Sequence, residues 1–198
     1  MPASPRLILA SLSASRKAML AGAGVAFEAV PSQVDEAALK AGFSGPPAAL
    51  AAALALAKAR AVSALYPRAL VIGGDQLLAC GDELYDKPRD LTEAASHLRA
   101  LAGRTHELVT AVCLVRGGER LWAHEERARL TMRHVSEAFL QSYLAAEAGE
   151  ILHCVGAYRL EGPGAQLFTR VEGDYFTVLG LPLLALLDAL RARGVLAA

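Results

Sequence analysis

The chain has 198 residues, of which 54% are hydrophobic and 20% are charged, and 20 lysines and arginines balance 20 aspartates and glutamates. This composition excludes an intrinsically disordered chain, and the lack of a basic excess argues against a protein that binds long nucleic acid. No uninterrupted apolar stretch reaches the roughly 18 residues of a membrane-spanning helix, so we expect no membrane partner. The length predicts one domain, residues 1–198, with at most two lobes.

The first half of the chain alternates between strand-like and helix-like patterns. In chain order it predicts a strand at 6–10, a helix up to Leu20, a short strand at 27–30, a brief helix opening at Asp35, a long alanine- and leucine-rich helix at 48–65, and a strand at 69–79. Lys58 interrupts the apolar pattern of the long helix, and Asp75 interrupts that of the last strand.

The second half predicts a helix at 92–101 capped by Thr92, hairpin strands at 106–116 and 120–133, a helix at 136–146 capped by Ser136, strands at 158–161 and 166–171, and a closing helix at 181–193. Helices and strands mix without strict alternation. The predicted fold class is therefore α/β or α+β, with a mixed sheet.

The cysteines Cys80, Cys113 and Cys154 are far apart and flanked by apolar residues, with no C-x-x-C pair. We interpret them as buried thiols in a reducing compartment and expect a cytoplasmic protein. A cysteine hydrolase built on Cys154 and His153 is the alternative, but adjacent residues of a strand point to opposite faces. The histidines show no zinc-binding spacing.

A serine-rich loop between the first strand and the first helix is one candidate site. Ser11, Ser13 and Ser15 precede the cations Arg16 and Lys17. Hydroxyl groups and backbone N–H groups at a helix N-terminus favour a bound anion, and cations in the first turn indicate that something negative faces them. The alternative is a serine N-cap beside solvated charges.

Charged residues inside apolar segments form a second group. Asp75 follows two glycines in an apolar strand, so it is expected to be paired, hydrogen-bonded or metal-bound, and the glycines imply a close approach by another group. Lys58 must either extend its ammonium to solvent or meet an anion. Lys87, Glu36 and Glu161, taken singly, are also explained as surface or capping residues.

In chain order these residues resemble the Maf family of nucleoside triphosphate pyrophosphatases, and the likeness covers nearly the whole chain. The matching segments are Leu9-Ala-Ser-x-Ser13-x-x-Arg16-Lys17-x-x-Leu20, Val34-Asp-Glu36, Leu54-Ala-x-x-Lys58-Ala59, Gly74-Asp75, Lys87-Pro88, Ala102-Gly-Arg104-Thr-His with Thr110, and Glu172-Gly-Asp-Tyr with Gly180-Leu-Pro182. The resemblance implies an inosine-triphosphatase-like fold, an elongated mixed sheet whose two lobes flank a nucleotide cleft. It also implies hydrolysis between the α- and β-phosphates with a divalent cation, Mg²⁺, Mn²⁺ or Co²⁺.

The resemblance also implies roles for individual residues. Asp75 is the expected catalytic residue, orienting or deprotonating water, and Glu36 and Asp75 are the expected metal ligands. The expected phosphate-binding residues are Ser11, Ser13, Arg16, Lys17, Lys58 and Lys87. The expected base-specificity residues are Ser15, Gln76 and Glu161.

Gln76 and Glu161 resemble the branch of the family that acts on 7-methyl-GTP, since a carboxylate accepts hydrogen bonds from the N1–H and amino group of guanine. A dTTP/UTP pyrophosphatase and a non-catalytic nucleotide-binding regulator of cell division are the alternatives. The expected partner is a small nucleotide, and a homodimer is consistent with the resemblance and the apolar composition.

Overall fold

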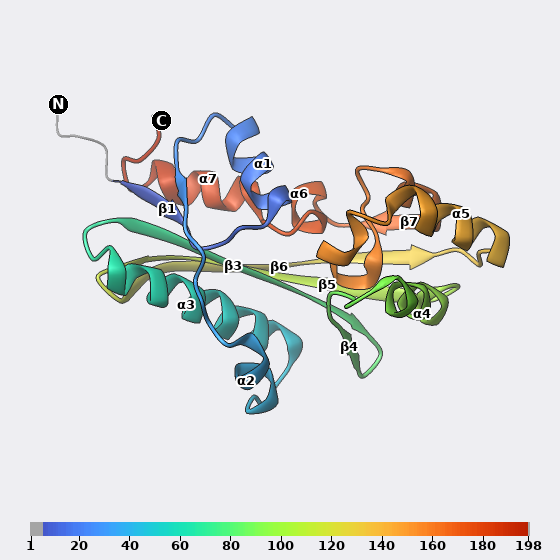
Figure 1. The fold of residues 1–198 in the computed structure, drawn as a ribbon. Coiled ribbons are helices and arrows are strands. Elements are labelled where there is room, and N and C mark those ends of the chain that lie inside the picture. The colour runs from blue at the N-terminus through green and yellow to red at the C-terminus, as the bar shows by residue number, and fades with distance from the viewer. Residues whose placement is uncertain (1–5, 198) are drawn as a thin grey trace. The chain divides into compact units, whose positions relative to one another are not determined.

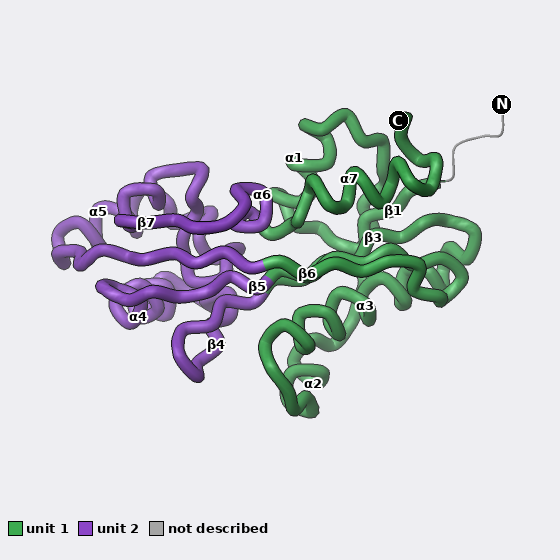
Figure 2. Tube along the Cα trace, turned by 180° about the vertical axis from the view of Figure 1, so that it is seen from behind, with its two compact units in different colours: residues 1–76, 110–126, 180–198 green, residues 77–109, 127–179 purple. Residues whose placement is uncertain are grey.

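The computed structural model describes residues 6–197 and forms a mixed α/β fold around a seven-stranded sheet (Figure 1). The strand order is β2-β1-β3-β5-β6-β7, and β4 pairs with β3. This confirms the predicted fold class and the mixed sheet. The chain divides into unit 1, residues 6–76, 110–126 and 180–197, and unit 2, residues 77–109 and 127–179 (Figure 2). The sequence shows no linker because the chain passes between the units inside β3, β5 and β6.

Unit 1 is a layered α/β arrangement. Its elements are β1 (Leu7–Leu9), α1 (Ala14–Gly22), β2 (Glu28–Ala29), α2 (Glu36–Ala41), α3 (Pro47–Leu65), α7 (Leu183–Arg191) and parts of β3 (Leu70–Cys80), β5 (Thr105–Arg116) and β6 (Glu119–Met132). β1 pairs in parallel with β2 and with β3, so that Ile8 lies opposite Glu28 and Val71. In Figure 1, α1 and α7 cover one face of β1 and β3, and α3 covers the other.

Gly73 allows β3 and α3 to approach each other closely. A Cβ atom at this position would collide with the Ala55 carbonyl oxygen and would also lie 2.7 Å from the Ala59 Cβ. At Gly74, on the opposite face, a Cβ would lie 3.5 Å from Arg16 Nε. The predicted close approach is confirmed at Gly73, whereas at Gly74 a Cβ would make only an ordinary van der Waals contact with Arg16.

Among the described helices, α3 alone is long and apolar enough to cross a membrane, with 19 residues and a mean hydropathy of 1.6. Half of its apolar window is buried, with Leu54, Ala55, Ala59 and Val62 fully inside. The core helix of a soluble protein passes the same test of length and composition.

Unit 2 contains the remaining parts of β3, β5 and β6. Its other elements are β4 (Glu83–Tyr85), α4 (Leu91–Leu101), α5 (Glu137–Glu147), 3₁₀ turns at 151–153, 155–157 and 163–167, β7 (Phe168–Glu172) and α6 (Tyr175–Val178). β4 pairs antiparallel with the end of β3, and β7 pairs antiparallel with the end of β6. The unit packs around one apolar core that includes Leu78, Leu98, Leu108, Leu130 and Ile151.

Two local predictions in unit 2 are wrong. Residues 158–161 form no strand: Tyr158 is extended, but the chain turns at 160–162, where the Gly162 N–H donates to the Arg159 carbonyl at 3.4 Å. Asp90, not Thr92, caps α4, since its carboxylate accepts from the Glu93 N–H at 2.8 Å. The Ser136 cap on α5 is confirmed.

Candidate functional site

Lys58 and Asp75 form an ion pair between α3 and β3. The Lys58 Nζ lies 2.6 Å from Asp75 Oδ1 and donates a hydrogen bond to it. The Asp75 side chain is 7% exposed and that of Lys58 is 10% exposed. Each charge therefore compensates the burial cost of the other, which explains why a lysine interrupts an apolar helix and an aspartate interrupts an apolar strand.

Glu36 joins this pair from the first turn of α2. Its Oε1 lies 2.8 Å from Lys58 Nζ, and its side chain is 43% exposed. The helix is held at that point by Asp35, whose side chain caps it through the Ala38 N–H at 2.9 Å. Lys58, Glu36 and Asp75 thus form a triad in which two carboxylates converge on one ammonium group.

The serine loop forms the N-terminus of α1, as predicted. Ser13 is the N-cap and accepts from the Arg16 N–H at 3.4 Å. Its own N–H donates to Ser11 Oγ at 3.2 Å, and its hydroxyl lies 3.1 Å from that of Ser15. The loop is therefore held by its own hydroxyl groups in front of a helix N-terminus, where the helix dipole favours an anion.

Arg16 is buried, not solvated. Its Nε donates to the Gly180 carbonyl at 2.7 Å, and its Nη1 donates to Ser11 Oγ at 3.4 Å. Burial lowers the pKa of the Arg16 guanidinium, whereas the charges of Asp75 and Glu36 act in the opposite direction. An arginine keeps its charge in such a setting, so a cation is fixed within the field of the two carboxylates. Lys17 follows on α1 and is half-buried.

The triad fits a divalent cation that arrives together with a phosphate ligand. Carboxylate oxygens suit Mg²⁺ and Mn²⁺, and proteins often bind Mg²⁺ through one or two carboxylates plus substrate phosphates. Glu36 and Asp75 supply two such groups at the point where Lys58 lies. Within residues 6–197 no group of three or more His, Cys, Asp or Glu side chains could hold a metal ion by itself.

Gln76 is held in one orientation beside the triad. Its Nε2 donates to Thr110 Oγ1 at 2.9 Å, and its Oε1 lies 3.5 Å from the place where a Cβ on Gly180 would stand. Sequence reasoning assigned no role to Thr110 or to Gly180. Both residues lie in segments that resemble the Maf family, and this resemblance was the only signal for them in the sequence. Thr110 lies 34 residues from Gln76, and Gly180 lies 164 residues from Arg16, so no local pattern links either pair.

Lys87 and Glu161 belong to unit 2, whereas the other predicted site residues belong to unit 1. Both side chains are exposed, and both lie within electrostatic range of Cys154. Burial raises the pKa of Cys154 to about 11, with Glu161 adding to the shift and Lys87 opposing it. Residues 151–157 form 3₁₀ turns, so the strand argument against a cysteine nucleophile does not hold, but a neutral, half-buried thiol makes a poor one.

Comparison with known proteins shows similarity over nearly the whole length. A family model described as "Maf-like protein" matches residues 6–193. A 7-methyl-GTP pyrophosphatase of Rhizobium etli is 49% identical over 97% of this chain and 98% of its own length, and one of Rhizobium meliloti is 50% identical over the same shares. A nucleoside triphosphate pyrophosphatase of Hyphomonas neptunium is 52% identical over 95% of this chain and 96% of its own.

Proposed function

The chain belongs to the Maf-like protein family, and from this we propose that it hydrolyses a nucleoside triphosphate between the α- and β-phosphates, releasing a nucleoside monophosphate and pyrophosphate. The observation that carries the proposal is the triad of Lys58, Glu36 and Asp75 beside the buried Arg16. A binding module for phosphates needs the cations but not two carboxylates among them. Relatives about half identical to this chain carry pyrophosphatase names, which supports the same reaction.

The N-terminus of α1 would receive the phosphate groups of the substrate. Ser11 and Ser13 offer hydroxyl groups, the first turn of α1 offers backbone N–H groups, and Arg16 and Lys17 add two positive charges. Arg16 is already fixed by Gly180 and Ser11, so its charge is oriented before the substrate arrives. Such preorganised charge stabilises the negative charge that develops on the departing pyrophosphate.

Asp75 would act as the general base. A water oxygen forms a bond to the α-phosphorus, its proton passes to the Asp75 carboxylate, and the bond from the α-phosphorus to the bridging oxygen breaks. Lys58 can turn from the carboxylates toward the added negative charge of the phosphates, because its flexible side chain ends within reach of both acids. A divalent cation held by Glu36 and Asp75 would supply Lewis-acid polarisation of the phosphate oxygens.

For the base we propose 7-methylguanine. Gln76, which the family resemblance assigns to the base, is held by Thr110 Oγ1, which accepts from its amide nitrogen at 2.9 Å. The family resemblance assigns Glu161 to the base as well, and its exposed carboxylate has the chemistry that suits the N–H donors of guanine and the positive charge of a methylated purine. Two of the relatives described above are named for this substrate, whereas the third carries the broader name.

Replacing Asp75 tests the reaction class. Asp75→Asn keeps an acceptor for Lys58 but removes the base, so kcat should fall by about 100-fold or more. Asp82→Asn, an exposed change in the turn that follows β3, is the matched control and should retain full activity. Pyrophosphate release is measured with Mg²⁺, Mn²⁺ and Co²⁺, and cooperative melting confirms the fold. Unchanged turnover in Asp75→Asn would contradict the assignment.

A substrate panel tests the base. The wild type is assayed with 7-methyl-GTP, GTP, UTP, dTTP and CTP, and 7-methyl-GTP should give the highest kcat/KM. Glu161→Gln should reduce that preference and leave the pyrimidine rates unchanged. A preference for UTP or dTTP would overturn the base assignment while leaving the reaction class intact. No turnover of any triphosphate would instead favour the nucleotide-binding regulator.

A further inference from the structure

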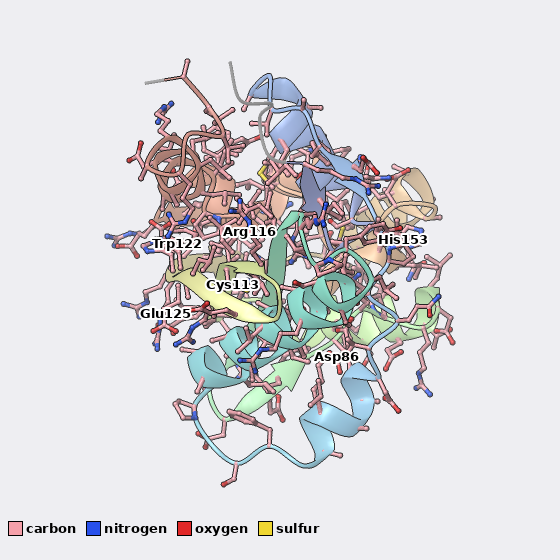
Figure 3. All side chains as sticks on the ribbon, turned by 90° about the vertical axis from the view of Figure 1, so that its left-hand side faces the viewer. Asp86, Cys113, Arg116, Trp122, Glu125 and His153 are labelled. Atoms are coloured by element: carbon pink, nitrogen blue, oxygen red, sulfur yellow. The ribbon has the colours of Figure 1, made fainter. Side chains whose placement is uncertain are left out.

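Two carboxylates of unit 2 hold the side chain of Arg159. Its Nε donates to Glu147 Oε2 at 2.9 Å, and its Nη1 donates to Glu150 Oε2 at 3.2 Å. Glu147 is the last residue of α5, and its side chain is 7% exposed, whereas that of Glu150 is 60% exposed. Figure 3 labels His153, which is exposed in the 3₁₀ turn that follows Glu150. The pair with Glu147 is therefore the buried one, and breaking it would leave an uncompensated charge inside the unit.

A tight turn packs against this ion pair. Residues 160–162 form the turn, and the Gly162 N–H donates to the Arg159 carbonyl at 3.4 Å. A Cβ atom on Gly162 would lie 3.4 Å from Arg159 Nη2 and 3.6 Å from both carboxylate oxygens of Glu147. A Cβ atom on Gly164 would collide with the Arg159 carbonyl oxygen. The turn therefore rests on both the side chain and the backbone of Arg159.

Glu161 is the middle residue of this turn. Its side chain is exposed, so the conformation of the turn decides where the carboxylate lies. The hydrogen bond to Glu147 raises the pKa of Arg159, and the charge of Glu161 acts in the same direction, which places Glu161 within electrostatic range of the guanidinium. The residue after Glu161 is Gly162, which lies against the ion pair. The position of Glu161 thus depends on Arg159.

A carboxylate that recognises a purine has to be held in one place. The N1–H and the amino group of guanine donate to it together, so both carboxylate oxygens must be aligned with the base at once. Displacing a positioned group by about 1 Å can cost up to about 100-fold in rate. Uracil does not offer this pair of donors. A loosened turn would therefore penalise a guanine nucleotide and leave a uracil nucleotide unaffected.

We propose that Arg159, held by Glu147, is a positioning residue for base selection, because it fixes the 160–162 turn and with it the carboxylate of Glu161. The proposal rests on the proposed function, in which Glu161 receives the 7-methylguanine base. Arg159 itself needs no contact with the substrate. When its ion pair is lost, the turn moves and the preference for 7-methyl-GTP falls, while hydrolysis continues.

Replacing Arg159 tests this role. In Arg159→Met the ratio of kcat/KM for 7-methyl-GTP to kcat/KM for UTP should fall by about tenfold, through a higher KM for 7-methyl-GTP, with the UTP values unchanged. Arg159→Lys keeps a cation opposite Glu147 and should retain most of the ratio. Arg99→Met is the matched control, since Arg99 pairs with Glu137 in the first turn of the same helix α5. It should leave the ratio unchanged.

A double variant tests whether Arg159 acts through Glu161. Adding Arg159→Met to Glu161→Gln should lower the ratio no further than Glu161→Gln alone, because the carboxylate that Arg159 positions is already gone. Arg159→Met leaves Glu147 uncompensated, so Glu147→Gln in the same background provides a variant without the buried charge. That variant should show the same tenfold fall, and thermal melting confirms its fold.

The outcomes separate this proposal from the proposed function. A wild-type preference for 7-methyl-GTP that persists in Arg159→Met would overturn the positioning role alone. The same would follow from an equal fall in kcat/KM for both substrates, which indicates a structural role, or from a further loss in the double variant. A wild type without a preference for 7-methyl-GTP would overturn the positioning role and the base assignment together.

Discussion

A buried ion pair of unit 1 and a buried histidine of unit 2 satisfy their ionisable side chains in opposite ways. In unit 1, Lys58 and Asp75 are buried as charges and satisfy each other at 2.6 Å. In unit 2, His106 is 1% exposed and has a neutral partner, with its Nε2 lying 2.7 Å from the Tyr158 hydroxyl. Burial lowers the pKa of His106 to about 4, so the ring is neutral near pH 7.

This difference distinguishes buried side chains that can bind ions from buried side chains that only pack against their neighbours. A buried charge that is paired with an opposite charge can change partners when an ion binds. The bound ion then compensates the free-energy cost of burying that charge. A neutral histidine packed against Tyr158 and Phe168, with ring centroids 5.5 and 6.0 Å away, offers nothing to a charged ligand. The Lys58–Asp75 pair is therefore suited to bind ions, whereas the neutral His106 cluster is not.

The largest predicted effect comes from breaking the triad. Lys58→Met leaves Asp75 buried without its ammonium and beside Glu36, and the loss of one partner of a buried pair costs roughly 3–5 kcal/mol in the free energy of unfolding. Urea denaturation measures the loss. Adding Mg²⁺ should raise the melting temperature of the variant more than that of the wild type, because a cation can replace the missing ammonium.

Two further variants control this prediction. Asp75→Asn in the Lys58→Met background removes the uncompensated charge and should recover most of the lost stability. Arg68→Met, at an exposed position in the turn between α3 and β3, should change the free energy of unfolding by no more than about 0.5 kcal/mol. Equal losses in Lys58→Met and Arg68→Met would show that the triad is not an energetic unit.

The sequence predicted the three residues of the triad but not that their side chains contact one another. A lysine in an alanine-rich helix and an aspartate in an apolar strand each predict a buried partner, and the two prove to be partners of each other. Their contact depends on the close packing of α3 on β3 at Gly73; the glycines predicted a close approach there but not that α3 would be the neighbour. The burial of Arg16 was not predicted, because its acceptor on Gly180 comes from the far end of the chain.

Local patterns failed where the backbone conformation is set by packing. The segment Tyr158-Arg-Leu-Glu161 indicated a strand, yet it forms none, and the Tyr158 ring packs against His106 and Phe168. The starts of three helices were predicted more accurately than this strand. Their N-caps form hydrogen bonds with backbone groups only three residues away, at Ser13, Asp35 and Ser136.

The second prediction concerns pH and unit 2. His106 has a folded pKa of about 4 against a usual value of 6.5. Between these values the unfolded chain binds a proton that the native state does not, so stability is full above pH 6.5 and falls as the pH drops toward 4. The shift corresponds to about 3 kcal/mol. His106→Gln keeps a hydrogen-bonding group without titrating near these values, and should lose about 3 kcal/mol less than the wild type between pH 7 and pH 4.

Denaturant titrations at several pH values measure this difference, and the carboxylates that titrate in both proteins cancel in the comparison. Parallel curves for wild type and variant would contradict the prediction. Pyrophosphatase activity at pH 7 should be the same in both, because the His106 cluster lies outside the phosphate site.

The smallest effect compares two matched caps. Ser13 caps α1 in unit 1 and Ser136 caps α5 in unit 2, each accepting from a backbone N–H three residues on, at 3.4 and 3.2 Å. Replacing either with alanine should cost about 1 kcal/mol in the free energy of unfolding. Ser13→Ala should in addition raise KM for the triphosphate several-fold, because its hydroxyl belongs to the phosphate-binding loop, whereas Ser136→Ala should leave KM unchanged. Equal KM values in the two variants would remove Ser13 from the binding site and leave it a structural cap alone.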